Sequence, residues 1–296
     1  MDVSGYLKEK ARAVEAALDG YLEQNGTVPE TILEAMRYSV FAGGKRLRPI
    51  LAIATAETLE ADPEQVMPTA CALEMIHTYS LIHDDLPSMD DDDLRRGKPT
   101  CHKVFGEAVA ILAGDALLTE AFRLVAENAT MSGVECADAV AATREIAEAS
   151  GAAGMVGGQV LDLEAEGKDL SIDELRRLHS KKTGALITVA VRAAAILSGA
   201  TGEQLPCLTA FAEKLGLAFQ IVDDVLDVEG DTASLGKTAG KDAAQHKATF
   251  PALLGLEASK ARAAQLIESA TSDLEIFGPS ADALRSIAGF VVDRSS

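Results

Sequence analysis

Six aspartates crowd into the ten residues of DDLPSMDDDD, which spans residues 84–93. Carboxylates this close repel one another, and burial would push one of them toward its protonated form unless a cation lay between them. The segment therefore indicates a metal site, a solvated surface, or both.

A second acidic cluster lies in FQIVDDVLD, residues 219–227. Gln220, Asp223 and Asp227 are spaced so that they share one face of a helix, with Asp224 beside them. Either cluster alone is weak evidence, because an aspartate-rich chain produces such spacings by chance and exposed aspartates are simply solvated. Both clusters follow strongly apolar runs, however, where an unpaired carboxylate is costly. Together they favour a divalent-metal site.

The helix that precedes the first cluster, CALEMIHTYSLIHDD, places His77 on the same face as Asp84. Pro87 is expected to bend or end this helix, which would turn Asp90 back toward Asp84. The first cluster is thus predicted to form at the end of an apolar helix.

Oxygen ligands without histidine or cysteine neighbours suit Mg²⁺, which commonly bridges a few carboxylates to the phosphates of a substrate. The formal net charge is −19, yet cations gather near the aspartates. They lie in GGKRLRP (43–49), LRRGK (94–98) and SKKTG (180–184), and at Lys237 and Lys247. This arrangement predicts a substrate that carries phosphate.

The elements that must position these groups are predicted to be helices. Hydrophobic residues make up 48% of the 296-residue chain, aromatic residues only 4%, and apolar positions recur at helical spacing. Two longer polar breaks, at 87–107 and 229–250, are predicted to be loops that follow the aspartates. The apolar run at 185–200 contains Arg192 and is too short to span a bilayer comfortably, so we expect a buried core helix.

Composition also excludes several classes of protein. An acidic chain lacks the basic surface that a nucleic acid needs. The four cysteines are far apart, which indicates neither a zinc site nor a disulfide framework and fits a reducing cytoplasm. The N-terminal segment is amphipathic and does not resemble a signal peptide, and no membrane span is expected.

The order of GGKRLRP, DDLPSMDDDDLRRGKPT, KTG and FQIVDDVLD resembles that of the short-chain trans-prenyltransferases, most closely their bacterial, farnesyl-forming branch. The resemblance covers about residues 20–292. It implies an all-α fold, a single-domain helical bundle of the isoprenoid synthase type with a central cavity, over residues 1–296. It also implies a homodimer and a Mg²⁺-dependent 1′–4 condensation of isopentenyl diphosphate with dimethylallyl and geranyl diphosphate, with release of pyrophosphate.

The resemblance assigns roles to individual residues. About three Mg²⁺ ions would be held by Asp84, Asp90 and Asp223, with Asp85, Asp224 and Asp227 able to act through water. The residues assigned to isopentenyl diphosphate are Gly44, Lys45, Arg48, His77 and Arg96. Those assigned to the allylic diphosphate are Arg95, Lys182, Thr183, Gln220, Lys237 and Lys247, of which Thr183 and Gln220 would also stabilise the allylic cation.

Product length would be set by the depth of the cavity below Asp84. Tyr79 lies five residues earlier, about 7.5 Å down the helix axis, and Ser80 lies almost under Asp84. In this family an aromatic residue at that position is typical of a floor that stops the chain at C15. The principal alternative is a C20-forming geranylgeranyl diphosphate synthase. A class I terpene cyclase would not need GGKRLRP, and a non-catalytic subunit would be expected to have lost metal ligands or lysines.

Overall fold

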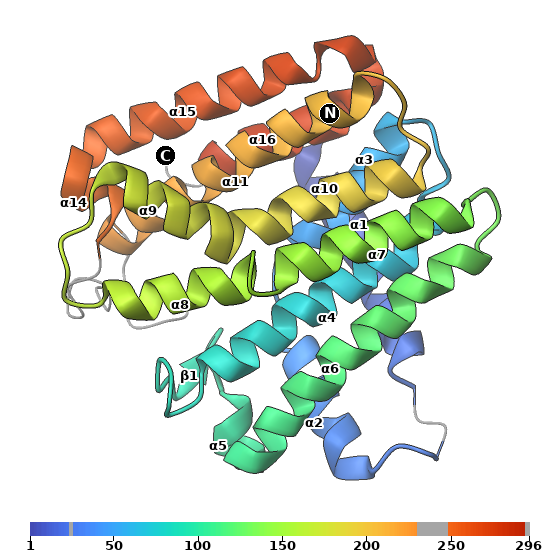
Figure 1. Cartoon of the computed structure of the whole chain (residues 1–296), viewed down its shortest axis with the longest axis vertical. Coiled ribbons are helices and arrows are strands. Elements are labelled where there is room, and N and C mark those ends of the chain that lie inside the picture. The colour runs from blue at the N-terminus through green and yellow to red at the C-terminus, as the bar shows by residue number, and fades with distance from the viewer. Residues whose placement is uncertain (24–25, 230–247, 294–296) are drawn as a thin grey trace.

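Long helices make up almost all of the secondary structure in this computed structural model, which describes residues 1–23, 26–229 and 248–293 (Figure 1). The all-α prediction is confirmed. The strands of the described part of the chain form one antiparallel pair, in which β1 (Leu94–Arg95) lies beside β2 (Lys98–Pro99).

Through the first half of the chain the helices are α1 (Val3–Tyr21), α2 (Glu30–Val40), α3 (Leu47–Thr58), the 3₁₀ turn η1 (Pro63–Val66), α4 (Met67–Asp84), α5 (Cys101–Phe105), α6 (Glu107–Glu127) and the 3₁₀ turn η2 (Asn128–Thr130). The second half contains α7 (Cys136–Ser150), α8 (Met155–Ala165), α9 (Ile172–His179), the π-helical turn η3 (Ser180–Gly184), α10 (Ala185–Leu197), α11 (Gln204–Glu229), α14 (Phe250–Leu254), α15 (Leu256–Asp273), the 3₁₀ turn η4 (Glu275–Ala281) and α16 (Asp282–Asp293).

Helices α4 and α10 lie in the interior. Helix α4 packs against α3, α6 and α10, and every residue from Met67 to Ile76 is buried. Helix α10 packs against α3, α7 and α11, which confirms the core helix predicted from its apolar sequence. A helix that is apolar on all sides belongs inside a protein. The first aspartate cluster therefore stands at the end of a firmly packed element.

The polar segment 87–107 is more ordered than the single loop that the sequence predicted. It contains the β1–β2 hairpin and the short helix α5. Thr100 lies between β2 and α5, and its hydroxyl donates to Asp92 O, just before β1, at 2.8 Å. A pattern of charges and glycine cannot distinguish such a hairpin from a loop, because its pairing depends on tertiary contacts. Of the second predicted loop, residues 230–247 lie outside the described residues.

Among the described helices, α11 alone is long and apolar enough to cross a bilayer by length and composition. It packs against α10 and α15, and residues from Leu208 to Val225 contribute to the core. This is the ordinary behaviour of a long core helix.

Candidate active site

The first aspartate cluster forms where α4 ends. Asp84 is the last residue of the helix, and Asp90 N donates to Asp84 O at 2.9 Å, so the predicted return of the chain is confirmed. Asp85 is buried at 3% exposure and accepts from Arg95 Nε at 2.8 and 2.9 Å. The family resemblance assigns Asp85 to a metal through water and Arg95 to the allylic diphosphate, and in the structure these two side chains pair with each other.

Burial raises the pKa of Asp84 to about 6. Lys182 opposes this shift, and the neighbouring carboxylates Asp90 and Asp85 add to it, with Arg95 acting in the opposite sense. An ionised carboxylate that nearby cations do not fully compensate is a good ligand for a further cation. The fit to Mg²⁺ rests on this electrostatic setting and on the oxygen-only ligand set.

The second cluster projects from the C-terminal half of α11. Asp224 is buried and accepts from two donors, Gln220 Nε2 at 3.1 Å and Phe250 N at 3.0 Å. Asp223 is less buried and contributes to the electrostatic environment of Arg48 on α3. Helices α3, α4 and α11 therefore bring their predicted site residues into one region.

The π-helical turn η3 carries the predicted lysine and threonine. Lys182 Nζ donates to Asp162 on α8 at 2.6 Å, and burial lowers the lysine pKa less than Asp162 and Asp84 raise it. Gly158 of α8 lies against this turn, since a Cβ there would be 2.2 Å from Lys182 N. Tight packing thus fixes the turn, and the carboxylates of Asp162 and Asp84 keep Lys182 positively charged.

A pocket of about 120 Å³ lies between η3, α8 and α11. Its lining includes four residues predicted from the sequence, namely Lys182, Thr183, Gln220 and Asp224. It also includes His179, to which sequence reasoning assigned no role, because one histidine at a helix end carries no signal.

The residues assigned to isopentenyl diphosphate also meet. Gly44, with φ of 132°, lies against Arg96, and a Cβ would be 2.5 Å from the Arg96 guanidinium. His77 is surrounded by arginines: burial lowers its pKa well below the ordinary value, and Arg48 and Arg96 lower it further. Within the described part of the chain, Arg48 Nε is buried without a hydrogen-bond partner. The arginines Arg48 and Arg96, with uncharged His77 beside them, are suited to binding an anion.

Arg46, which the sequence analysis did not assign, has a structural role in the same loop. It is 2% exposed, donates from Nη1 to Glu74 on α4 at 2.8 Å and from Nη2 to Val40 O at 2.7 Å, and reaches Glu15 at 3.3 Å. Its backbone is left-handed, with φ of 51°. The three cations of GGKRLRP look alike in the sequence, and only burial separates Arg46 from its neighbours.

Tyr79 and Ser80 lie on α4 before the first cluster. Tyr79 is 7% exposed and packs edge-on against His83, with ring centroids 5.7 Å apart. Burial, followed by the charge of Asp84, raises the pKa of Tyr79 to about 12. The hydroxyl of Ser80 donates to His77 O at 2.8 Å. Helix α4 therefore carries Glu74, His77, Tyr79 and Asp84 in succession.

Two predicted residues, Lys237 and Lys247, lie outside the described residues. Within residues 1–23, 26–229 and 248–293, no three acidic, histidine or cysteine side chains converge as a ready-made metal site. Magnesium sites commonly use one or two carboxylates and complete their shell with substrate phosphate and water. The two separate clusters suit that kind of shared site.

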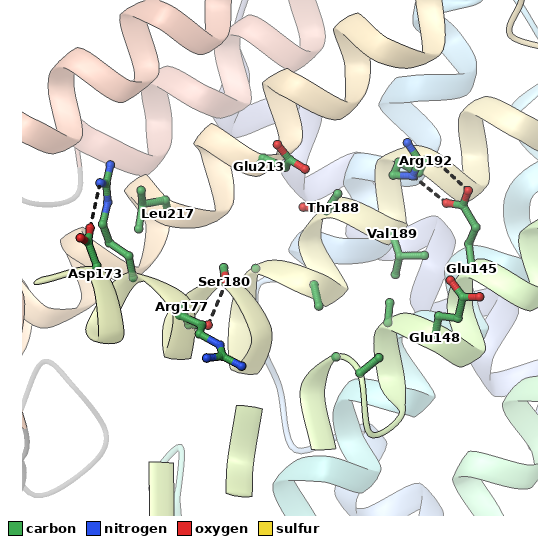
Figure 2. A pocket seen from close by; sticks show the side chains of 16 residues that line it. Glu145, Glu148, Asp173, Arg177, Ser180, Thr188, Val189, Arg192, Glu213 and Leu217 are labelled. Atoms are coloured by element: carbon green, nitrogen blue, oxygen red, sulfur yellow. Dashed lines mark hydrogen bonds and ion pairs between the residues drawn. The ribbon is translucent and has the colours of Figure 1, made fainter. Parts of the chain in front are cut away.

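A wider pocket, of about 790 Å³, lies elsewhere, between α7, α9, α10 and α11. Figure 2 shows Arg192 beside Glu145 there, and Arg192 Nε donates to that carboxylate at 2.6 Å. The lining contains none of the residues predicted for metal or diphosphate binding. The wider pocket is therefore not the predicted active site, whose residues gather at the aspartate clusters and the smaller pocket.

Comparison with known proteins gives consistent matches. The polyprenyl synthetase family profile matches residues 29–277. A farnesyl diphosphate synthase of Geobacillus stearothermophilus is 50% identical over 274 residues, covering 93% of this chain and 92% of the relative. A chloroplastic geranylgeranyl pyrophosphate synthase of Capsicum annuum is also 50% identical, over 92% of this chain and 73% of its own length. The crystal structure of a geranyltransferase from Legionella pneumophila aligns with a TM-score of 0.88 at 34% identity, over 99% of this chain and 98% of that one.

Proposed function

The chain belongs to the polyprenyl synthetase family, and we propose that it condenses isopentenyl diphosphate with dimethylallyl diphosphate and then with geranyl diphosphate, giving farnesyl diphosphate and pyrophosphate. The observation that carries the proposal is the pairing of two anion sites. One is formed by the cations Arg48 and Arg96 with uncharged His77 beside them, and the other by Lys182 and the two aspartate clusters. A reaction that joins two diphosphates needs both.

The residues at the aspartate clusters would hold the metal. Asp84, Asp90 and Asp223 are proposed as direct ligands of about three Mg²⁺ ions, and Asp85, Asp224 and Asp227 as ligands through water. The existing hydrogen bonds of Asp85 and Asp224 support this division, because much of their acceptor capacity is already used. When bound, Mg²⁺ supplies charge neutralisation for the departing pyrophosphate.

The protein's own groups orient the reactants. Lys182 presents a fixed positive charge to the allylic diphosphate, and charge stabilisation of this kind acts most strongly on the pyrophosphate that departs. Thr183 and Gln220 line the same pocket and can direct oxygen atoms toward the allylic cation. No side-chain base stands among these motifs, so the proton lost after the new bond forms is assigned to the departing pyrophosphate.

We propose that residues 1–296 form a single catalytic domain and that the enzyme is a cytoplasmic homodimer. Large apolar side chains are exposed on three consecutive helices, with Leu112 on α6, Val140 on α7, and Val156 and Val160 on α8. Contact with a second copy would cover them. The four cysteines are free, which is consistent with a reducing compartment.

The first test is product analysis with isopentenyl and dimethylallyl diphosphates, with Mg²⁺ and with EDTA. We expect a Mg²⁺-dependent C15 product. A C20 product would retain the reaction and favour geranylgeranyl diphosphate synthesis, as the similarity to the Capsicum annuum relative allows. The absence of any condensation product would overturn the proposal.

Product length provides a second prediction. Replacing Tyr79 with alanine should lengthen the main product from C15 to C20, because removal of a buried ring would deepen the cavity that we propose below Asp84. Chromatography of the dephosphorylated products measures this directly. Tyr21→Ala removes an aromatic ring from α1 and serves as the control. An unchanged product from the Tyr79 variant would rule out the floor.

A third prediction concerns the recognition of isopentenyl diphosphate. Arg48→Met should raise the KM for isopentenyl diphosphate by about 10–100-fold, because a charge-assisted hydrogen bond contributes about 1.5–3 kcal/mol. The KM for the allylic diphosphate should change far less. Arg12→Met, which removes an exposed arginine on α1, is the matched control. Equal increases in both KM values would argue against a dedicated site at Arg48.

A further inference from the structure

His179, to which the sequence assigned no role, lies beside the second aspartate cluster with a buried ring nitrogen. It ends α9, immediately before the π-helical turn that carries Lys182, and is 9% exposed. Its Nε2 lies 3.6 Å from Asp224 Oδ2. Within the described part of the chain this buried nitrogen has no hydrogen-bond partner. A buried polar atom left unpaired costs about 1–3 kcal/mol, so its placement calls for an explanation.

The surroundings of the ring limit its movement. His179 stacks on Phe250 with ring centroids 5.7 Å apart and an angle of 22° between the planes. Phe250 N donates to Asp224 Oδ2 at 3.0 Å, the same oxygen that His179 approaches. Gln220 donates to the other oxygen at 3.1 Å. Three elements, α9, α11 and α14, thus meet at one carboxylate.

The separation of 3.6 Å exceeds a hydrogen bond by about half an ångström. Hydrogen bonds at catalytic sites are often long in the unliganded protein and shorten when substrate binds. A small shift of the carboxylate toward the ring would complete the bond, provided that Nε2 carries the proton. The stack on Phe250 keeps the ring plane fixed while this happens.

We infer that His179 is a positioning residue, which donates a hydrogen bond from Nε2 to Asp224 and thereby fixes the carboxylate for the metal–diphosphate complex. The inference rests on the role proposed above for the second aspartate cluster. Groups that hydrogen-bond to metal-site carboxylates fix their orientation, and losing such a partner commonly costs about 10–100-fold in metal affinity or activity. His179 acts through Asp224 and need not touch the substrate.

The test compares His179→Phe, which keeps an aromatic ring against Phe250 but has no N–H, with His179→Gln, which keeps an N–H donor. The probe is inorganic pyrophosphate, whose binding in the presence of Mg²⁺ is measured by calorimetry and does not depend on turnover. We expect the phenylalanine variant to bind it about 10–100-fold more weakly. The KM for the allylic diphosphate should rise with it, the KM for isopentenyl diphosphate should stay within about twofold, and glutamine should restore most of the loss.

His102→Phe is the matched control. His102 is also buried, and its Nε2 also has no partner within the described residues, but it lies on α5 and its Nδ1 contacts Thr100 instead of an aspartate. This variant should leave pyrophosphate binding unchanged. An equal loss of pyrophosphate binding in the His102 and His179 variants would show a nonspecific effect of replacing a buried histidine and would overturn the inference.

A double-mutant cycle decides whether the effect passes through Asp224. In an Asp224→Asn background, His179→Phe should cost little more, because the carboxylate that it positions is gone. Additive losses, or wild-type pyrophosphate binding by His179→Phe, would overturn the inference. If His179→Phe does not fold, His179→Asn, whose shorter side chain cannot reach Asp224, takes its place in the same comparisons. A wild-type enzyme that forms no product would refute the proposed function instead, so the two failures are distinguishable.

Discussion

Replacing Asp84 with alanine should lower kcat by at least about 10²–10³-fold, because it removes a proposed metal ligand whose effect is greatest as charge develops on the leaving pyrophosphate. Asp84 stands at the end of buried α4, where Asp90 returns to it and Lys182 interacts with it. Steady-state kinetics with isopentenyl and dimethylallyl diphosphates measure the effect. Asp223→Ala is expected to cause a loss of similar size.

The matched control for Asp84 is Asp91→Asn. Asp91 belongs to the same acidic run but is exposed, and its left-handed backbone, with φ of 49°, suits asparagine. This variant should retain near-normal kcat. Near-normal kcat in the Asp84 variant would instead remove the metal assignment.

Stability separates a catalytic loss of Asp84 from a folding defect. Burial raises the pKa of Asp84 to about 6 in the folded protein, above its unfolded value, so ionisation of this group disfavours folding increasingly as the pH rises from the unfolded pKa to the folded pKa, and in full above it. The penalty shrinks as the pH falls through about 6 and is absent below the unfolded pKa. In metal-free buffer at pH 7.5 the alanine variant should therefore have a Tm equal to or above that of the wild type.

Replacing Arg46 with alanine should lower the free energy of unfolding by about 3–5 kcal/mol, because it would leave Glu74 buried without its cation. The pair is almost completely buried, with Arg46 Nη1 2.8 Å from Glu74 Oε1. A loss of this size is a large share of the stability of a typical domain. Urea unfolding followed by circular dichroism provides the measurement.

The control for Arg46 is Arg123→Ala. Arg123 makes ion pairs with Glu120 and Glu127 on α6, but these pairs lie at the surface. Its loss should cost less than about 1 kcal/mol. Adding Glu74→Gln to Arg46→Ala should recover part of the stability, since no buried charge would then be left alone. If the urea concentration at the midpoint of unfolding were the same for Arg46→Ala and the wild type, the buried-pair argument would be contradicted.

The sequence predicted those features that depend on local pattern. Apolar periodicity identified the core helix at α10, and Pro87 after an apolar helix predicted the return of Asp90 to Asp84. The shared site of Gly44 and Arg96 came from the family resemblance instead of the local pattern, and the two residues lie in contact. For the α10 helix and for the return of Asp90, spacing along the chain nearly determines spacing in the structure.

Other features depend on which side chains meet across the fold, and the pattern could not predict them. The ion pair of Arg95 with Asp85 was not predicted, because it depends on the β1–β2 hairpin bringing Arg95 to the end of α4. Arg46 and Arg48 are two residues apart, yet one is occupied by Glu74 and the other has a buried Nε without a partner among the described residues. His179 reaches Asp224 only because three elements converge there.

Glu74, His77, Tyr79 and Asp84 follow one another along α4, so this helix sets the distances and directions between them. One inserted residue would turn everything beyond it by about 100° and advance it by about 1.5 Å. An insertion after Glu74 would therefore misdirect the proposed metal ligand Asp84, the proposed floor Tyr79 and the proposed diphosphate contact His77 together, while the buried Arg46–Glu74 ion pair stayed in place. Engineering of product length in this enzyme should therefore use substitutions on α4 and should leave the number of residues in this helix unchanged.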